Sequence, residues 1–208
     1  MFFEMREIDA ADILALADAR RGHFRMESGY HSAQWLDLEP LFVHPDRIQP
    51  IASALARLLE PAAPNAVCGP LVGGAFVAQL VANELGCELY FTERVDDLAT
   101  SGLFRARYRL PPSLARRVTG RRVAIVDDVI SAGSSARATF AALRDANARV
   151  VAVGALLLMG DAAPAWFADF AIPVVASART AFEIWPPESC PLCAANIPVE
   201  NPASDPPA

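Results

Sequence analysis

The apolar residues of this chain fall into stretches with strand-like and helix-like spacing. The run 123–126 is short and mostly β-branched, which is typical of a strand buried on both faces of a parallel sheet. The segment 45–59 instead carries apolar residues at helical spacing behind a proline suited to a first turn. The other predicted strands are 34–38, 66–68, 87–91, 149–158 and 172–176, and the other predicted helices are 9–19, 75–85 and 136–146. Their alternation predicts an α/β fold with a parallel sheet flanked by helices.

Two loops rich in small residues each connect a predicted strand to a predicted helix. The first loop is 69–74, and the second is 131–135, which follows the acids Asp127 and Asp128. Free backbone N–H groups at a helix N-terminus attract anions, and glycine lets a phosphate approach the main chain. Ligands of open α/β sheets bind just past the carboxyl ends of the strands. We therefore expect both loops to face one crevice, although a solvated turn would give a similar pattern.

Composition removes several classes of protein. The chain has 18 Lys+Arg against 24 Asp+Glu, for a net charge of −6, and it contains no lysine. A P-loop and a Schiff-base enzyme both need a lysine, so neither class fits. The acidic balance argues against a general nucleic-acid binder, because such binding depends on positive charge.

The length of the chain and the composition of its two ends indicate how the protein is organised. A chain of 208 residues suits a single domain, which we expect to span 1–197, with a proline-rich disordered tail at 198–208. No apolar run reaches the length of a membrane span, and the N-terminal residues lack the profile of a signal peptide. We therefore expect a cytoplasmic protein with no membrane partner.

The run 123–135 resembles the phosphoribosyl-pyrophosphate (PRPP) signature of the type I phosphoribosyltransferases. In that signature hydrophobic residues precede two acids and a Thr/Ser-Ala/Gly-Gly-x-Ser/Thr loop. The resemblance implies that Asp127 and Asp128 are the catalytic acids, which bind the ribose hydroxyls, and that the loop 131–135 binds the 5′-phosphate. The implied PRPP-binding residues are Asp127, Asp128, Val129, Ile130, Ser131, Ala132, Gly133, Ser134 and Ser135.

The same resemblance extends to the first loop. Its Gly-Pro-x-x-Gly-Gly pattern is similar to the loop that lies against the pyrophosphate in this family, and Arg94 fits the arginine of a Glu-Arg pair. The implied diphosphate-binding residues are Leu71, Val72, Gly73, Gly74 and Arg94. The family further implies a Mg²⁺ ion that bridges diphosphate and sugar hydroxyls, with no protein ligand identified, and a homodimer.

The segment 22–38 resembles the amino-terminal part of the orotate phosphoribosyltransferases, which forms a hood over the nucleobase. The resemblance implies that the hood here consists of about residues 20–40 and the C-terminal part of the domain. The implied base-binding residues are Phe24, Ser28, Gly29, His31 and Ser32. Considered without the resemblance, Phe24 and Trp35 are more typical of a core and His31 of a surface. The implied reaction transfers the 5-phosphoribosyl group from PRPP to orotate, giving orotidine 5′-phosphate and diphosphate in pyrimidine biosynthesis.

Two departures from the orotate pattern keep other functions open. Met159-Gly160-Asp161 stands where orotate enzymes carry an Asp-Arg pair whose arginine holds the substrate carboxylate, a role left here to Arg25, His31 or Arg179. The mobile flap expected within 95–120 lacks its lysine, although 103–122 contains seven arginines and no acid, which suits a diphosphate or a solvated hairpin. The alternatives are a phosphoribosyltransferase for another base and a non-catalytic PRPP- or nucleotide-binding regulator.

A Cys190-Pro-Leu-Cys193 motif lies near the C-terminus. Followed by Ile-Pro, it resembles the ending of one bacterial and archaeal branch of orotate phosphoribosyltransferase-like proteins. A structural zinc site usually needs four ligands, and Cys68, Cys87 and the three histidines are distant in sequence. A zinc site, a redox pair and two half-buried thiols therefore all remain open.

Overall fold

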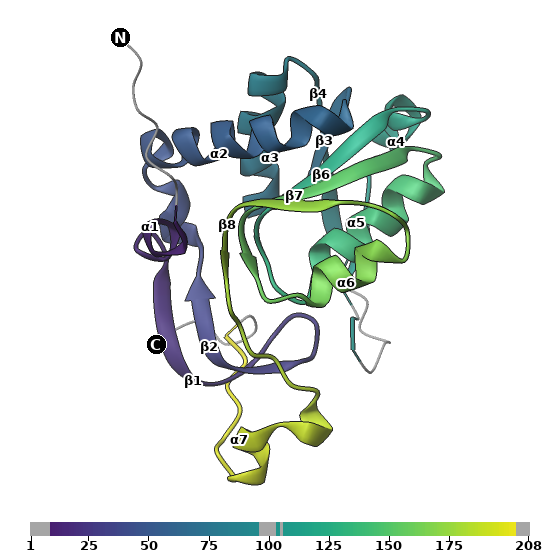
Figure 1. The fold of residues 1–208 in the computed structure, drawn as a ribbon. Helices are drawn as coiled ribbons and strands as arrows, with labels where there is room; N and C mark the ends of the chain where they lie inside the picture. Colours follow the sequence, from purple (N-terminus) through teal and green to yellow (C-terminus); the bar gives the residue numbers. More distant parts are fainter. Residues whose placement is uncertain (1–8, 96–102, 105, 203–208) are drawn as a thin grey trace.

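The protein is built on a six-stranded sheet, seen in a computed structural model that describes residues 9–95, 103–104 and 106–202 (Figure 1). The strand order is β5-β4-β3-β6-β7-β8, and all pairs are parallel except β4 with β5. The strands are β3 Ala66–Pro70, β4 Glu88–Val95, β5 Arg107–Arg109, β6 Arg122–Ile130, β7 Arg149–Met159 and β8 Val174–Thr180. The predicted α/β class is thus confirmed.

Helices cover both faces of the sheet. They are α1 Ala10–Leu14, α2 Pro45–Leu59, α3 Gly73–Leu85, α4 Pro112–Val118, α5 Ser134–Asp145, α6 Ala162–Ala168 and α7 Pro191–Ala194, with 3-10 turns at Glu39–Phe42, Glu60–Ala62 and Pro187–Ser189. On β6, Ala124 and Val126 pack with α2 and α3, whereas Val123 and Ile125 pack with α5 and α6. Of the helices in the described ranges, none has the length and apolar character to cross a membrane.

Most predicted elements are present, although several of their ends differ by a few residues, and two of these differences change the picture. The helix predicted over 9–19 ends at Leu14, because Asp18 already pairs with Asp37 in a strand; this pairing overrides the helical preference of the alanines. The strand predicted over 123–126 continues to Ile130. Asp127 and Asp128 therefore lie within β6, still paired to β7 through Asp127, rather than beyond its end.

A second, two-stranded sheet stands apart from the main one. Strands β1 Asp18–Arg25 and β2 His31–Asp37 are antiparallel, and the C-terminal segment with α7 lies against them (Figure 1). Trp185 exchanges backbone hydrogen bonds with His31, and Glu200 pairs alongside Phe24. We call β1, β2 and residues 183–202 the hood. The predicted disordered tail thus begins with residues that pair with β1, and 203–208 lie outside the described residues.

Candidate active site

A cavity of about 790 Å³ lies where β3 and β6 lead into their helices. Its volume suits a ligand of the size of a nucleotide. The predicted phosphate-binding residues in its wall are Leu71, Val72, Gly73, Gly74, Asp127, Asp128, Val129, Ile130, Ser131, Gly133, Ser134 and Ser135. Both loops therefore open onto one cavity, whereas Ala132 is buried and is not part of the wall.

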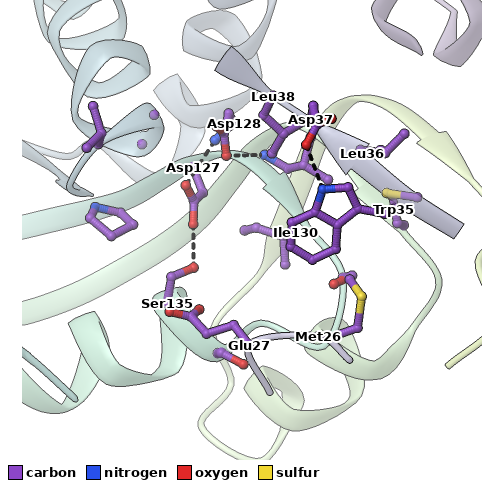
Figure 2. A pocket seen from close by; sticks show the side chains of 18 of the residues that line it. Met26, Glu27, Trp35, Leu36, Asp37, Leu38, Asp127, Asp128, Ile130 and Ser135 are labelled. Carbon is purple, nitrogen blue, oxygen red and sulfur yellow. Dashed lines mark hydrogen bonds between the residues drawn. The ribbon is translucent and has the colours of Figure 1, made fainter. Parts of the chain in front are cut away.

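The two acids at the base of the cavity are oriented by nearby donors (Figure 2). The Ser135 hydroxyl donates to Asp127 Oδ2 at 2.6 Å, and the backbone N–H of Asp128 donates to Asp127 Oδ1 at 3.1 Å. The backbone N–H of Val129 donates to Asp128 Oδ1 at 2.7 Å. Since Ser135 belongs to α5, its hydrogen bond ties the start of that helix to the end of β6.

Both carboxyl groups are buried, with 5% of Asp127 and 8% of Asp128 exposed. Burial raises the pKa of Asp127 well above its usual range, and the neighbouring Asp128 charge raises it further. Burial also raises the pKa of Asp128, against the opposing effect of the Val129 N–H. Ionising this pair is costly in the folded protein, and ligand hydroxyls or a cation placed here would offset that cost.

Glycine is required where the first loop meets the acids. A Cβ on Gly73 would overlap Asp128 Oδ2, and a Cβ on Gly74 would lie 2.6 Å from Asp127 Oδ1. The peptide bond between Leu71 and Val72 is cis. Helix α3 begins at Gly73, so its free backbone N–H groups face the cavity beside the carboxylates. The second loop has its own requirement, since Gly133 caps α5 with φ of 80°.

The hood supplies the opposite wall. Glu27 and Ser28 come from the β1–β2 turn, and Trp35 and Asp37 come from β2. The Trp35 indole N–H donates to Asp37 Oδ1 at 2.7 Å (Figure 2). Sequence reasoning missed Trp35 and Asp37, although the alternation over 34–38 places both on the same face of the strand.

Of the five predicted base-binding residues, Ser28 lines the cavity. Phe24 is fully buried, and Gly29 lies in the turn without reaching the wall. The Ser32 hydroxyl donates to the Glu183 carbonyl at 3.1 Å. His31 is directed toward His23, with its Nδ1 2.9 Å from His23 Nε2. Burial, followed by the charges of His23 and Arg25, lowers the pKa of His31.

Arg94 lies at the border between the sheet and the hood. Its guanidinium forms an ion pair with Glu27 at 2.9 Å, and the Tyr108 hydroxyl donates to the same carboxylate oxygen at 3.2 Å. Burial raises the pKa of Tyr108, and the charges of Glu27 and Asp127 add to the shift. The diphosphate role of Arg94 remains a prediction.

The described part of the cavity wall is acidic. It contains six carboxylates and no arginine, the acids being Asp18, Glu27, Asp37, Glu39, Asp127 and Asp128. From the arginine-rich segment, Arg121 pairs with Glu88 and Arg122 donates to backbone carbonyls. Much of the predicted flap, 96–102 together with Arg105, lies outside the described residues.

This donor set fits the Mg²⁺ ion that the resemblance implies. Mg²⁺ prefers oxygen ligands and usually shares them between carboxylates, water and substrate phosphates. Asp127 and Asp128 present buried carboxylates to the cavity, and among the described residues no arginine forms an ion pair with either. These two residues would help to hold the ion, which would supply positive charge beside a bound diphosphate.

Comparison with known proteins agrees with this geometry. The model of the phosphoribosyl transferase domain matches residues 38–173. The chain is 32% identical over 203 residues to the orotate phosphoribosyltransferase of Heliobacterium modesticaldum, covering 96% of this chain and 99% of that protein. This chain belongs to the phosphoribosyltransferase family. The cavity is accordingly the candidate active site of this phosphoribosyltransferase.

Solved phosphoribosyltransferase structures share the fold. An orotate phosphoribosyltransferase from Aeropyrum pernix superposes with a TM-score of 0.58 at 24% identity, covering 77% of this chain and 87% of that chain. An adenine phosphoribosyltransferase from Thermoanaerobacter pseudethanolicus gives a TM-score of 0.63 at 15% identity, covering 82% and 99%. Since this fold serves both bases, the base used here must be argued from the site.

Proposed function

We propose that this phosphoribosyltransferase transfers the 5-phosphoribosyl group from PRPP to orotate, giving orotidine 5′-phosphate and diphosphate. The observation that carries the proposal is that two amide-lined loops and two buried acids meet in one cavity beneath the hood. The 32% identity with an orotate phosphoribosyltransferase over nearly the whole chain supports orotate as the base.

The proposed mechanism separates charge along the bond between the sugar and the diphosphate. Asp127 and Asp128 accept hydrogen bonds from the ribose hydroxyls, and the first turn of α5 binds the 5′-phosphate. The first turn of α3 holds the departing diphosphate, whose charge a bound Mg²⁺ would neutralise. As the sugar C1 becomes positive, the two buried carboxylates stabilise it electrostatically, so no side chain acts as a nucleophile.

The apolar side of the cavity suits a flat base. Met26 and Trp35 from the hood lie near Ile130 of β6 (Figure 2). Met159 and Phe182 also line the cavity. A pyrimidine ring placed here would contact an aromatic face and exclude water from the reacting carbon. We assign the base to this wall of the cavity.

One observation favours a second candidate, transfer to a base without a carboxylate. Met159 lines the cavity close to the position at which orotate enzymes are expected to carry an arginine. The described part of the cavity wall contains no arginine. A buried carboxylate without a cation costs several kcal/mol by order of magnitude. Uracil is orotate without its carboxylate. Comparing the two bases therefore tests whether the site can hold a carboxylate.

The deciding experiment offers the full-length protein PRPP and Mg²⁺ with orotate, uracil, xanthine or adenine in separate reactions. Nucleotide and diphosphate are measured together. We expect orotate to exceed uracil in kcat/KM by about 10²-fold or more. A preference for uracil or a purine establishes the second candidate. Calorimetric binding of PRPP without turnover of any base instead indicates a regulator. Light scattering on the same sample tests the homodimer that we also propose.

A further inference from the structure

Four metal-ligating side chains meet inside the hood. His23 lies on β1, His31 begins β2, and Cys190 and Cys193 flank the start of α7. Their ligand atoms all lie within 4.8 Å of one another. None of the four lines the active-site cavity, so the cluster is separate from the PRPP and base sites.

Three distances between a histidine nitrogen and a cysteine sulfur in the cluster are close to the edges of a tetrahedron around a metal ion, and the distance between the two histidine nitrogens is shorter. His31 Nδ1 lies 2.9 Å from His23 Nε2 and 3.3 Å from Cys193 Sγ. His23 Nε2 lies 3.4 Å from Cys190 Sγ and 3.7 Å from Cys193 Sγ. With ordinary zinc–nitrogen and zinc–sulfur bonds, ligand atoms of a tetrahedral site stand about 3.3–3.8 Å apart.

Hydrogen bonding alone does not explain the arrangement. His23 Nδ1 lies 2.7 Å from the Ile197 carbonyl, which can only accept, so this nitrogen carries the proton and Nε2 has a single lone pair. Three atoms approach that one lone pair, from His31, Cys190 and Cys193. Convergence on a common centre accounts for all three. The Nδ1–H bond to a carbonyl is also the usual way in which a metal-binding histidine is oriented.

The hood needs a stabilising element other than an apolar core. Among the described residues, the two apolar clusters around the main sheet contain no buried member from 18–37 or 183–202, and Leu36 alone from these segments packs against them. A two-stranded sheet by itself is marginally stable in water. His23, His31 and Cys190 are nevertheless buried, at 1%, 7% and 3% exposure, and both cysteines are free thiols.

We propose that His23, His31, Cys190 and Cys193 bind a structural Zn²⁺ ion. Two thiolates and two imidazoles in tetrahedral arrangement are the ligand set that selects zinc, and four protein ligands leave no open position for catalysis. On binding, each thiol releases its proton to solvent. The ion joins the two hood strands to the C-terminal segment and thereby fixes the turn that carries Glu27 and Ser28 to the cavity.

The test is metal analysis of the full-length, untagged protein purified under reducing conditions. We expect one zinc per chain by mass spectrometry, released when the thiols are blocked. Cobalt in place of zinc should give the visible bands of a tetrahedral ion and thiolate-to-metal charge transfer. Removing zinc should lower Tm by roughly 10 °C, and adding zinc back should restore it.

Variants within the chain give matched controls. Cys190→Ser and Cys193→Ser should each abolish stoichiometric zinc, and His31→Gln should weaken it. Cys87→Ser and His44→Gln alter a cysteine and a histidine outside the cluster, so both should retain one zinc per chain. If a cluster variant does not fold, the cobalt spectrum of the unaltered protein still decides the ligand set.

Three outcomes would overturn the proposal. The first is a protein that takes up no zinc or cobalt after full reduction. The second is a Cys190→Ser/Cys193→Ser double variant that binds as much zinc as the unaltered protein. The third is a cobalt spectrum without thiolate charge transfer. None of these measurements depends on which base the enzyme uses.

Discussion

Two regions of the molecule are held together in different ways. One is the hood, and the other is the crevice formed by the loops 69–74 and 131–135 with Asp127 and Asp128. The crevice sits on strands whose side chains are buried on both faces, and Val123, Ala124, Ile125 and Val126 are all fully covered. The hood instead has a largely exposed first strand and a few buried polar side chains, among them His23 and His31. The crevice proposed to bind phosphate thus rests on the core, whereas the hood above it depends on contacts between distant segments.

This difference implies that a substitution in one region can impair that region and leave the other intact. Changes to the crevice should remove chemistry while the fold remains, and changes to the hood should alter base binding and thermal stability while the crevice remains. The following tests are ordered from the largest expected effect to the smallest.

Asp127→Asn should lower kcat by about 10²-fold or more, because a neutral amide cannot stabilise positive charge on the sugar. It should also raise the free energy of unfolding at neutral pH by on the order of 1 kcal/mol. The folded-state pKa of Asp127 is raised, so its ionised form destabilises the fold as pH rises from the usual carboxylate pKa through the folded value.

The stability gain should therefore vanish in acid, below the unfolded-state pKa, where the carboxyl group is protonated in both states. Chemical denaturation at neutral pH and at a pH below the unfolded-state pKa measures this gain in the free energy of unfolding. Asp145→Asn, at an exposed position on α5, is the control and should change neither quantity. Unaltered turnover in Asp127→Asn would remove the role assigned to the acid.

Gly73→Ala should lower kcat/KM for PRPP about tenfold or more and destabilise the protein by about 1–3 kcal/mol, because the added methyl group overlaps Asp128. Gly86→Ala is a matched control at the other end of α3, where a Cβ meets nothing within 4 Å. Its φ of 61° makes alanine strained, so some stability is lost, but activity should persist. Equal loss of activity in both variants would contradict the idea that close packing of Gly73 against Asp128 is needed for activity.

Zinc removal from the hood should raise KM for the base several-fold and leave KM for PRPP nearly unchanged, because the loops 69–74 and 131–135 rest on the main sheet rather than on the hood. Steady-state kinetics with zinc-depleted and reconstituted protein measure both constants in the presence of Mg²⁺. Cys87→Ser carried through the same depletion controls for damage to free thiols. A matching rise in both KM values would show that the two regions are not separate.

The acid side of the pH profile should show the smallest effect. Since burial raises the pKa of Asp127 and Asp128, kcat/KM should fall at a pH above about 3.9, the ordinary value for aspartate. Asp128→Asn removes a neighbouring charge, so the residual activity should fall at lower pH than in the unaltered enzyme. Ionisation of the substrate is common to both enzymes and cancels in this comparison. Superimposable profiles would contradict the electrostatic coupling.

The crevice could be predicted from sequence because its determinants are contiguous. Strand, acids and anion-binding turn follow one another within 123–135, and local rules place such a turn at the carboxyl edge of the sheet. Two details differed from the prediction. Pairing with β7 holds Asp127 within β6, and Ala132 is buried rather than part of the cavity wall. The helix 45–59 was equally clear, because its apolar spacing matches the face that packs on the sheet.

The hood could not be predicted in this way, because its contacts join residues far apart in the chain. His23 and Cys190 are separated by 167 positions, and no periodicity indicates that they meet. The Cys-Pro-Leu-Cys motif supplied two ligands, but the two histidines became partners only through pairing of His31 with Trp185 and of Phe24 with Glu200. Trp35 was misjudged for the same reason, since the cavity it faces lies between elements from both ends of the chain.

The pairing of Glu200 beside Phe24 also bears on how the enzyme is made. At roughly 5–20 residues per second, a ribosome needs roughly 10–30 s to advance from the first hood strand to its C-terminal partner. During that interval the nascent hairpin has no closing segment, while the strands and helices between the two can already collapse into a sheet. We therefore expect the hood to be the last part of the molecule to assemble, and truncation shortly before Cys190 to leave a folded sheet with an uncovered cavity.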